Sequence, residues 1–366
     1  MLITRHLAYL TAGAIALTAC GTGDKTPPSD STSTASARTT HSGGAVDLTG
    51  AGATFPLPIY SKWFSDYATR TGVRINYQSI GSGGGIRQLT ERTVDFGASD
   101  APMSDAELAK ATRPILHFPT VLGAVVLTYN VPGVTQSLKL TGPLIADIFL
   151  GKITKWNDPR LTALNPSVKL PNTDILVVHR SEGSGTTYIF TDYLSTVSPA
   201  WASGPGRGKE VKWPVGLGGK GNEGVTGQIK QTPGAVGYVE LAYAKQNRLP
   251  YASVKNASGT FVEPTIAAVT AAAAGATASL GPTTDYRISI VNAPGPDAYP
   301  ISSFTYLLVY AREPDTTKGK ELVAFLHWYL HEGESSAPSL DYAPLPRTMI
   351  TQLDQRVASI KVGAGT

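Results

Sequence analysis

The sequence predicts an α/β protein with two lobes, and three observations lead to this fold class. The chain has 366 residues, which is long for one ordinary domain and fits two lobes of about 150 residues each. Apolar, β-branched runs alternate along it with segments of helical apolar spacing. Several strand-to-helix turns carry glycines and hydroxyl side chains. Because open α/β sheets bind ligands outside the carboxyl ends of their strands, these turns predict a ligand site.

The first 44 residues predict a signal peptide and a tether. Arg5 precedes an apolar run at 7–17, which is too short to span a bilayer but has the length of a signal-peptide core. Residues 17–21 (LTACG) resemble the lipobox of bacterial lipoproteins, which predicts a signal peptide over 1–19 and a lipid on Cys20. The alternative is a simple secretory leader with an unrelated cysteine. Residues 20–44 are rich in Thr, Ser, Pro, Gly and Ala, so we expect a flexible tether to the outer face of the membrane.

Charge and cysteine content argue against nucleic-acid binding and against stabilisation by disulfide bonds. The net charge is +4 at pH 7, and removing Arg5 with the leader leaves +3. No stripe rich in Lys and Arg is present, so the sequence gives no reason to expect nucleic acid as a partner. Cys20 is the only cysteine, so disulfides play no part in stability.

The first part of the folded body alternates strands and helices. We expect strands over 46–50, 73–80 and 94–99, and helices over 58–71, 86–92 and from 104 onward. Pro at the entry of the first helix and Gly72 after its end are typical start and stop signals. The aromatic residues of this helix have three- and four-residue spacing and are predicted core residues: Tyr60, Trp63, Phe64 and Tyr67.

Three polar side chains follow these three strands. Thr54, Ser82 and Asp100 occupy carboxyl-end positions where they can face one cleft. The glycine-rich loop at 81–85 lacks the Lys-Ser/Thr ending of a nucleotide P-loop, so ATP is not expected. The alternative for Asp100 is a helix cap in front of Ser104.

The rest of the chain supplies a second lobe and a return to the first. Residues 116–130 predict a strand that crosses into the second lobe, and residues 299–310 a strand that returns. Between them we expect helices at 142–149, after 186, up to 231 and at 265–278, and strands at 174–179 and 234–240. Helices at 318–330 and 349–360 close the fold. We interpret the Gly-Asn-Glu-Gly sequence at 221–224 as a tight connection in preference to a further anion contact.

The stretch at 180–187 (RSEGSGTT) predicts an anion site. It joins an apolar strand to a helix, so free amides point outward at the positive end of the helix dipole. Ser184 and Thr186 add hydroxyl donors, and Gly183 and Gly185 allow close approach of the backbone. Arg180 supplies a permanent charge and a planar fork of donors, which suits a tetrahedral oxyanion. A capped helix start with a surface Arg is the alternative.

The histidines give little support to catalysis or metal binding. His327 and His331 are four residues apart and can share a helical face, but a metal site needs more ligands than these two. The sequence therefore predicts no metal site. His179 lies within an apolar run, where a neutral core histidine is expected.

Six segments together resemble one family. They are residues 50–56 (GAGATFP), 81–85 (GSGGG), 95–102 (DFGASDAP), 151–157 (GKITKWN), 180–186 (RSEGSGT) and 213–222 (WPVGLGGKGN). From about residue 47 to the end, the chain resembles the PstS family, the phosphate-binding proteins of bacterial high-affinity phosphate uptake.

The resemblance implies a two-lobed type II periplasmic-binding-protein fold with a central ligand cleft and two crossover hinge strands. Lobe I would comprise residues 45–121 and 300–366, lobe II residues 122–299, and the hinges would lie near Thr120 and Pro300. Carried over motif by motif, the phosphate contacts fall on Thr54, Phe55, Ser82, Asp100, Arg180, Ser184, Gly185 and Thr186. The chain departs from the family at Glu182, where close relatives often carry Asp beside the binding Arg.

The function that the resemblance implies is an extracytoplasmic phosphate receptor that delivers its ligand to the membrane permease of an ATP-driven importer. We expect no cofactor, no metal and a monomer. One alternative is a secreted phosphatase or other hydrolase with Ser184 or Ser82 as nucleophile, which would need a base or metal ligands nearby. Another is a phosphate sensor or adhesin on the same fold.

Asp100 carries the most specific chemical hypothesis. Phosphate near neutral pH retains a proton that it can donate to a buried carboxylate, whereas sulfate has none. A site that hydrogen-bonds a substrate proton rejects an analogue lacking it by about 10⁴- to 10⁵-fold. We therefore expect Asp100 to discriminate phosphate from sulfate.

Overall fold

The computed structural model describes residues 46–277, 280 and 284–364. Residues 44–366 form one compact unit, referred to below as the folded body. The predicted signal peptide, the lipidation at Cys20 and the tether all lie outside the described residues. Within those residues, no helix combines the length and the apolar character that crossing a membrane requires.

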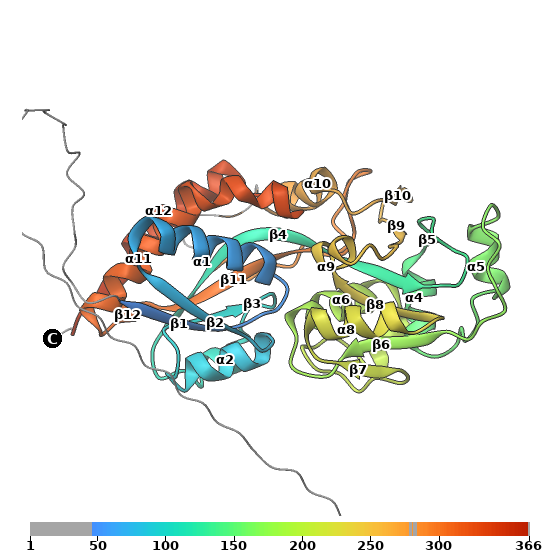
Figure 1. Cartoon of the computed structure of the whole chain (residues 1–366), viewed down its shortest axis with the longest axis horizontal. Coiled ribbons are helices and arrows are strands. Elements are labelled where there is room, and N and C mark those ends of the chain that lie inside the picture. Colours follow the sequence, from blue (N-terminus) through green and yellow to red (C-terminus); the bar gives the residue numbers. More distant parts are fainter. Residues whose placement is uncertain (1–45, 278–279, 281–283, 365–366) are drawn as a thin grey trace, which may run out of the picture. The chain divides into compact units, whose positions relative to one another are not determined.

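One eight-stranded sheet runs through the folded body in the order β2-β1-β3-β11-β4-β8-β6-β7 (Figure 1). Its strands are β1 (Asp47–Gly52), β2 (Arg74–Ser79), β3 (Phe96–Ser99), β4 (Ile115–Asn130), β6 (Leu176–Arg180), β7 (Leu217–Gly219), β8 (Ala235–Glu240) and β11 (Ser302–Tyr310). β1 lies parallel to β2 and β3, and β6 lies parallel to β7 and β8. These are two parallel groups, and β4 and β11 lie between them.

The long strand β4 links the two groups. Its first part pairs antiparallel with β11, from Ile115 opposite Tyr310 to Ala124 opposite Ser302. Its second part pairs with β8, from Val125 opposite Glu240 onward. The predicted strand at 116–130 is therefore confirmed, and so is a two-lobed α/β fold with crossover strands.

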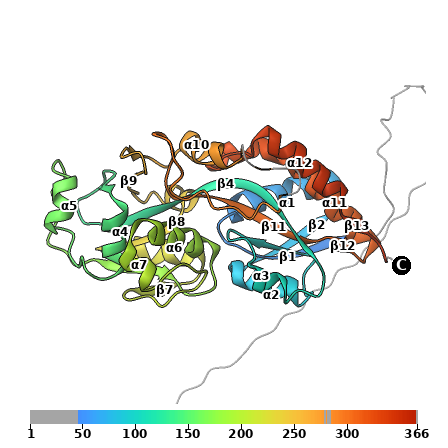
Figure 2. The same ribbon diagram turned by 180° about the vertical axis from the view of Figure 1, so that it is seen from behind.

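Helices cover both sides of the β1-β2-β3 group, which forms lobe I with its surrounding elements. These helices are α1 (Leu57–Thr71), α2 (Ser82–Thr90), α3 (Asp105–Leu108), α11 (Thr316–His331), the 3-10 helix η1 (Gly333–Leu340) and α12 (Arg347–Ala358). Figures 1 and 2 show α1, α11 and α12 on one side of the sheet and α2 on the other. The short parallel pair β12 (Arg312–Glu313) and β13 (Lys361–Val362) holds the last described residues to this lobe.

The β6-β7-β8 group forms lobe II with a second set of helices. They are α4 (Gly142–Phe149), α5 (Pro159–Leu164), α6 (Gly185–Val197), α7 (Pro199–Ser203), α8 (Gly221–Gln231), α9 (Leu241–Gln246) and α10 (Ile266–Thr277). A small sheet in the order β10-β9-β5 adds β5 (Lys139–Leu140), β9 (Ser253–Lys255) and β10 (Phe261–Val262). The sequence did not predict α5, α7, α9 or the short strands, because helices of five or six residues and strands of two or three residues carry too little periodic pattern.

Helix α1 shows how local signals and packing agree. It ends at Gly72, whose positive φ of 80° allows its N–H to bond the Ala68 carbonyl. The predicted aromatic face is buried, which confirms it as core. The Trp63 ring stacks on Tyr329 of α11 at 5.3 Å between centroids. This packing fixes the entry of α1, and with it Thr54, at the end of β1.

Candidate functional site

Arg180 lies at the end of β6 and is the only buried arginine in the described part of the chain. Its exposed fraction is 3%. Its Nε donates to Glu182 Oε1 at 2.9 Å, its Nη2 forms an ion pair with the same oxygen, and its Nη1 donates to Thr186 Oγ1 at 3.2 Å. Glu182 thus pairs with Arg180 although its side chain is longer than Asp, and its Oε1 also accepts from Gly221 N at 3.0 Å. A buried guanidinium held on one side by a carboxylate leaves donors to face a second anion.

Asp100 faces the same place from lobe I. It follows β3, is 2% exposed, and accepts from Thr186 Oγ1 at 3.3 Å and from Thr305 Oγ1 of β11 at 2.9 Å. Burial raises the pKa of Asp100 to about 7, against the opposing effects of Thr305, Arg180 and Thr186. The alternative of a helix cap is wrong, because Ser104 caps α3 through a capping box with Glu107.

The hydroxyls of Ser82 and Thr54 receive amides from two helix N-termini in lobe II. Ser82 Oγ accepts from Gly185 N at 3.0 Å, at the start of α6. Thr54 Oγ1 accepts from Asn222 N at 3.1 Å and from Asn222 Nδ2 at 2.8 Å, at the start of α8. Both helices therefore direct N-terminal amides and the positive ends of their dipoles at lobe I. Thr54, Ser82, Gly185 and Asn222 are all buried.

The other predicted site residues lie beside this cluster. Ser184 is the N-cap of α6, and its Oγ accepts from Thr187 N at 3.0 Å. A Cβ on Gly185 would lie 2.5 Å from Ser82 Oγ and 2.6 Å from Asp100 N, so only glycine allows this approach of the lobes. Phe55 is buried next to Thr54 at the entry of α1, and its carbonyl accepts from Tyr342 OH at 2.7 Å. Hydrogen bonds thus link Ser82, Asp100, Arg180, Gly185 and Thr186 directly and Thr54 through Asn222, while Phe55 and Ser184 are the chain neighbours of Thr54 and Gly185.

Asn222 belongs to the cluster although we interpreted its segment as a tight connection. That interpretation was incomplete: besides its bonds to Thr54, Asn222 Nδ2 donates to Thr186 Oγ1 at 3.3 Å, and its Oδ1 accepts from Glu240 N at 2.9 Å. The sequence signal for this role was the Gly-Asn pair at the entry of a helix, which repeats the arrangement of the Arg180 stretch. In the structure, Gly221 has a φ of 71°. Thr305 was missed because only the pairing of β11 with β3 brings it near Asp100.

His179 has no contact that would make it a catalytic base for either serine. Its Nδ1 lies 2.9 Å from the Arg180 carbonyl, and its ring stacks on Trp213 at 4.7 Å between centroids. Partial burial lowers the pKa of His179, so it is neutral at pH 7. In the described part of the chain, no hydrogen bond joins His179 to Ser82 or Ser184.

Further contacts hold the two lobes together around the cluster. Gly83 N donates to Gly183 O at 2.8 Å, and Lys209 Nζ forms an ion pair with Glu107 at 2.7 Å. Both contacts join lobe I to lobe II. The cluster therefore combines one cation, two helix N-termini, several hydroxyls and one carboxyl of raised pKa in a place closed to water. This set of groups suits a tetrahedral oxyanion that still carries a proton.

The raised pKa of Asp100 predicts a pH effect on stability without ligand. The pKa is 3.8 ordinarily and about 7 in the folded protein, so between these values the folded state binds more protons than the unfolded state. Stability from this group is therefore lost as pH rises from about 4 to about 7. Asp100→Asn removes this loss. When the pH is raised from 5 to 8, the free energy of unfolding of the variant should therefore increase by about 1–3 kcal/mol relative to that of the parent protein.

Urea unfolding of both proteins at pH 5 and pH 8, without phosphate, measures this gain. Comparing the two proteins cancels the opposite effect of His117, which both contain and whose burial lowers its pKa to about 3. A difference between variant and parent that does not change with pH would contradict the raised pKa.

Comparisons with known proteins identify close relatives. A family model described as a PBP superfamily domain matches residues 30–332. The phosphate-binding protein PstS of Pasteurella multocida is 47% identical over 314 residues, which cover 84% of this chain and 89% of the relative. The phosphate-binding protein PstS of Haemophilus influenzae is 46% identical over 316 residues, covering 84% and 92%. A crystal structure of a phosphate-binding protein from Stenotrophomonas maltophilia matches with a TM-score of 0.66, 20% identity and coverage of 85% and 94%, and supports the fold.

Proposed function

Because the chain belongs to the PstS family of phosphate-binding proteins within the PBP superfamily, we propose that its folded body binds one phosphate ion between the lobes and delivers it to an ATP-driven membrane permease. The observation that carries the proposal is the buried meeting of Arg180 and Asp100 with the N-termini of α6 and α8. An oxyanion held there would exchange the direct contacts between the lobes for contacts with its own oxygens.

The site would stabilise the anion through one full positive charge and through several neutral hydrogen-bond donors. Among the described residues of the cluster, Arg180 carries the only full positive charge, and the negative charge of Glu182 compensates part of it. The remaining stabilisation comes from neutral donors: the amides of Phe55, Gly185 and Thr186 and the hydroxyls of Thr54, Ser82, Ser184 and Thr186. Neutral donors at helix N-termini bind an anion without leaving excess positive charge in the empty site.

Asp100 supplies the selectivity. As a carboxylate it accepts the proton that phosphate retains, and Thr186 and Thr305 keep its two oxygens in place. Sulfate would place an oxygen lone pair against a lone pair of the carboxylate. Leaving a buried polar group without a hydrogen bond costs about 1–3 kcal/mol, and leaving a charged group without one costs more. The same geometry explains why a carboxylate belongs in an anion site.

Binding and release would follow from motion of the lobes. We assign residues 45–121 and 300–366 to lobe I and 122–299 to lobe II, with hinges near Thr120 and Pro300. Closure would bring α6 and α8 onto Thr54, Ser82 and Asp100 and complete the shell of the ion. We further propose that the chain acts outside the cytoplasm as a monomer, anchored through a lipid on Cys20.

Asn222 should contribute to affinity. We expect Asn222→Ala to weaken phosphate binding by about 1–2 kcal/mol, roughly 5- to 30-fold in Kd, because it removes the side chain that orients Thr54 and Thr186. Gln228→Ala on the same helix is the matched control, since Gln228 Nε2 bonds Gly218 O at 2.9 Å and, within the described residues, Gln228 has no hydrogen bond to the cluster. Calorimetric titration of both variants decides the point, and equal affinities would remove Asn222 from the site.

Delivery is tested separately from binding. Membrane vesicles that contain the cognate permease and ATPase subunits should take up labelled phosphate only when ATP and this protein are both present. Tight phosphate binding without stimulated uptake would support a sensor or adhesin in place of a transport receptor.

A further inference from the structure

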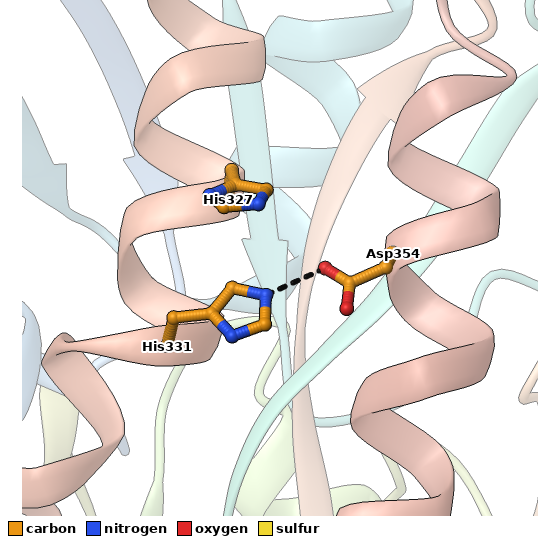
Figure 3. A group of neighbouring side chains, drawn as sticks. All are labelled: His327, His331 and Asp354. Carbon is orange, nitrogen blue, oxygen red and sulfur yellow. Dashed lines mark hydrogen bonds and ion pairs between the residues drawn. The ribbon is translucent and has the colours of Figure 1, made fainter.

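Helix α11 brings two histidines, four residues apart, next to an aspartate of α12 (Figure 3). His331 Nε2 lies 2.8 Å from Asp354 Oδ1, and the rings of His327 and His331 are 4.5 Å apart between centroids. One ligand atom from each of the three residues lies within 4.8 Å of the others. We propose that this cluster binds a divalent transition-metal ion such as Zn²⁺.

The chemistry of the three side chains fits such an ion. Imidazole nitrogen and carboxylate oxygen are ordinary Zn²⁺ ligands at about 2.0–2.2 Å, and imidazole favours Zn²⁺, Cu²⁺ or Ni²⁺ over Mg²⁺ or Ca²⁺. His327 and His331 occupy one helical face because they are four residues apart. Asp354 on α12 supplies a third, acidic ligand.

The spacing requires little rearrangement. Ligand atoms around a tetrahedral ion with bonds of about 2.1 Å lie about 3.4 Å apart. The pair of His331 and Asp354 is already closer than this, and an ion between them would replace their hydrogen bond. His327 is exposed, so its ring is free to turn toward them.

A neighbouring cavity gives the ion access and is lined in part by a buried carboxyl group. The cavity has a volume of about 640 Å³ and is lined by His331, Asp354, Arg347 and Glu334, among others. Glu334 is buried, and its Oε1 has no hydrogen-bond partner among the described residues. A hydrated ion can therefore enter and keep water in its fourth position.

Binding would join the last two helices of lobe I. Because the ion would bind the folded state, it should raise the melting temperature, with a stabilisation that grows with the logarithm of the ion concentration above Kd, and a chelator should reverse the effect. The site lies outside the cluster of Arg180 and Asp100, and none of its residues has a contact with that cluster in the described part of the chain. Phosphate affinity should therefore stay unchanged when the metal ligands are removed.

The test is titration of Zn²⁺ and Co²⁺ into the folded body produced from Gly44 onward without a histidine tag, which also leaves out His6 and His41. We expect one ion per chain and a visible Co²⁺ absorption band. Loss of a group that merely hydrogen-bonds a metal ligand costs about 10- to 100-fold in affinity, so His331→Ala and Asp354→Ala should each cost at least about 10-fold. Glu332→Gln, a neighbouring exposed carboxylate paired with Arg70, is the matched control.

Thermal unfolding without metal verifies that each variant is folded, since all of the changed side chains lie at the surface. Equal Zn²⁺ affinity in the parent protein and in His331→Ala would overturn the proposal, and so would the absence of saturable binding in the parent. Phosphate binding measured on the same samples separates failure of this site from failure of the phosphate site.

Discussion

Replacing Arg180 with alanine is expected to weaken phosphate binding by about 2–5 kcal/mol, roughly 30- to several-thousand-fold in Kd. Arg180 is 3% exposed, so its attraction to an anion is screened little by water or salt. The change removes the cation and leaves Glu182 facing the ligand. Binding of sulfate, or of any other tetrahedral oxyanion, should weaken as well.

Two further variants keep this result interpretable. Arg180→Lys retains the charge but not the planar fork that serves Glu182 and Thr186, so its affinity should lie between those of the parent protein and of Arg180→Ala. Arg74→Ala removes an exposed arginine paired with Asp47 and should bind phosphate like the parent protein. If Arg180→Ala is folded and binds phosphate with unchanged affinity, the anion site lies elsewhere.

Replacing Asp100 with asparagine should reduce discrimination between phosphate and sulfate more than any other single change. The parent site is expected to prefer phosphate by about 10⁴- to 10⁵-fold, because its carboxylate accepts a proton that sulfate lacks. The asparagine side chain has the same size and can turn an N–H donor toward sulfate. We therefore expect phosphate to bind more weakly and sulfate to bind more strongly.

Acidic pH should have a similar effect on the parent protein. Below its pKa of about 7, an unliganded Asp100 carries a proton and can act as a donor to sulfate, so selectivity should narrow as pH falls from 8 to 5. Asp95→Asn is the matched control, because Asp95 precedes the same strand but pairs with Lys318 outside the cluster. Competition of sulfate with labelled phosphate measures each variant, and a selectivity ratio that Asp100→Asn leaves unchanged would refute this role.

Local signals in the sequence were sufficient for the long elements and for most of the site. Helix α1 could be predicted from its proline entry, the glycine after its end and its aromatic spacing, and its bounds differ by one residue from those expected. Thr54, Ser82, Asp100 and the Arg180 stretch could be predicted because each follows a strand, and strands of one sheet place such positions along a common edge.

Other features depend on contacts between distant segments, which carry no local pattern. Thr305 reaches Asp100 across 205 residues of sequence, and Asp354 reaches His331 across 23. Asn222 had a local signal, but the choice between a connection and a contact required knowing that α8 points its N-terminus at Thr54. The short strand β7 is recognisable only by its parallel pairing with β6.

The most direct test of the proposed function is calorimetric titration of the folded body, stripped of bound anion, with phosphate and then with sulfate at pH 8. We predict tight binding of one phosphate per chain and no detectable heat from sulfate at the same concentrations. Absence of phosphate binding, or equal binding of the two anions, would contradict the assignment of this cluster as a phosphate-selective site.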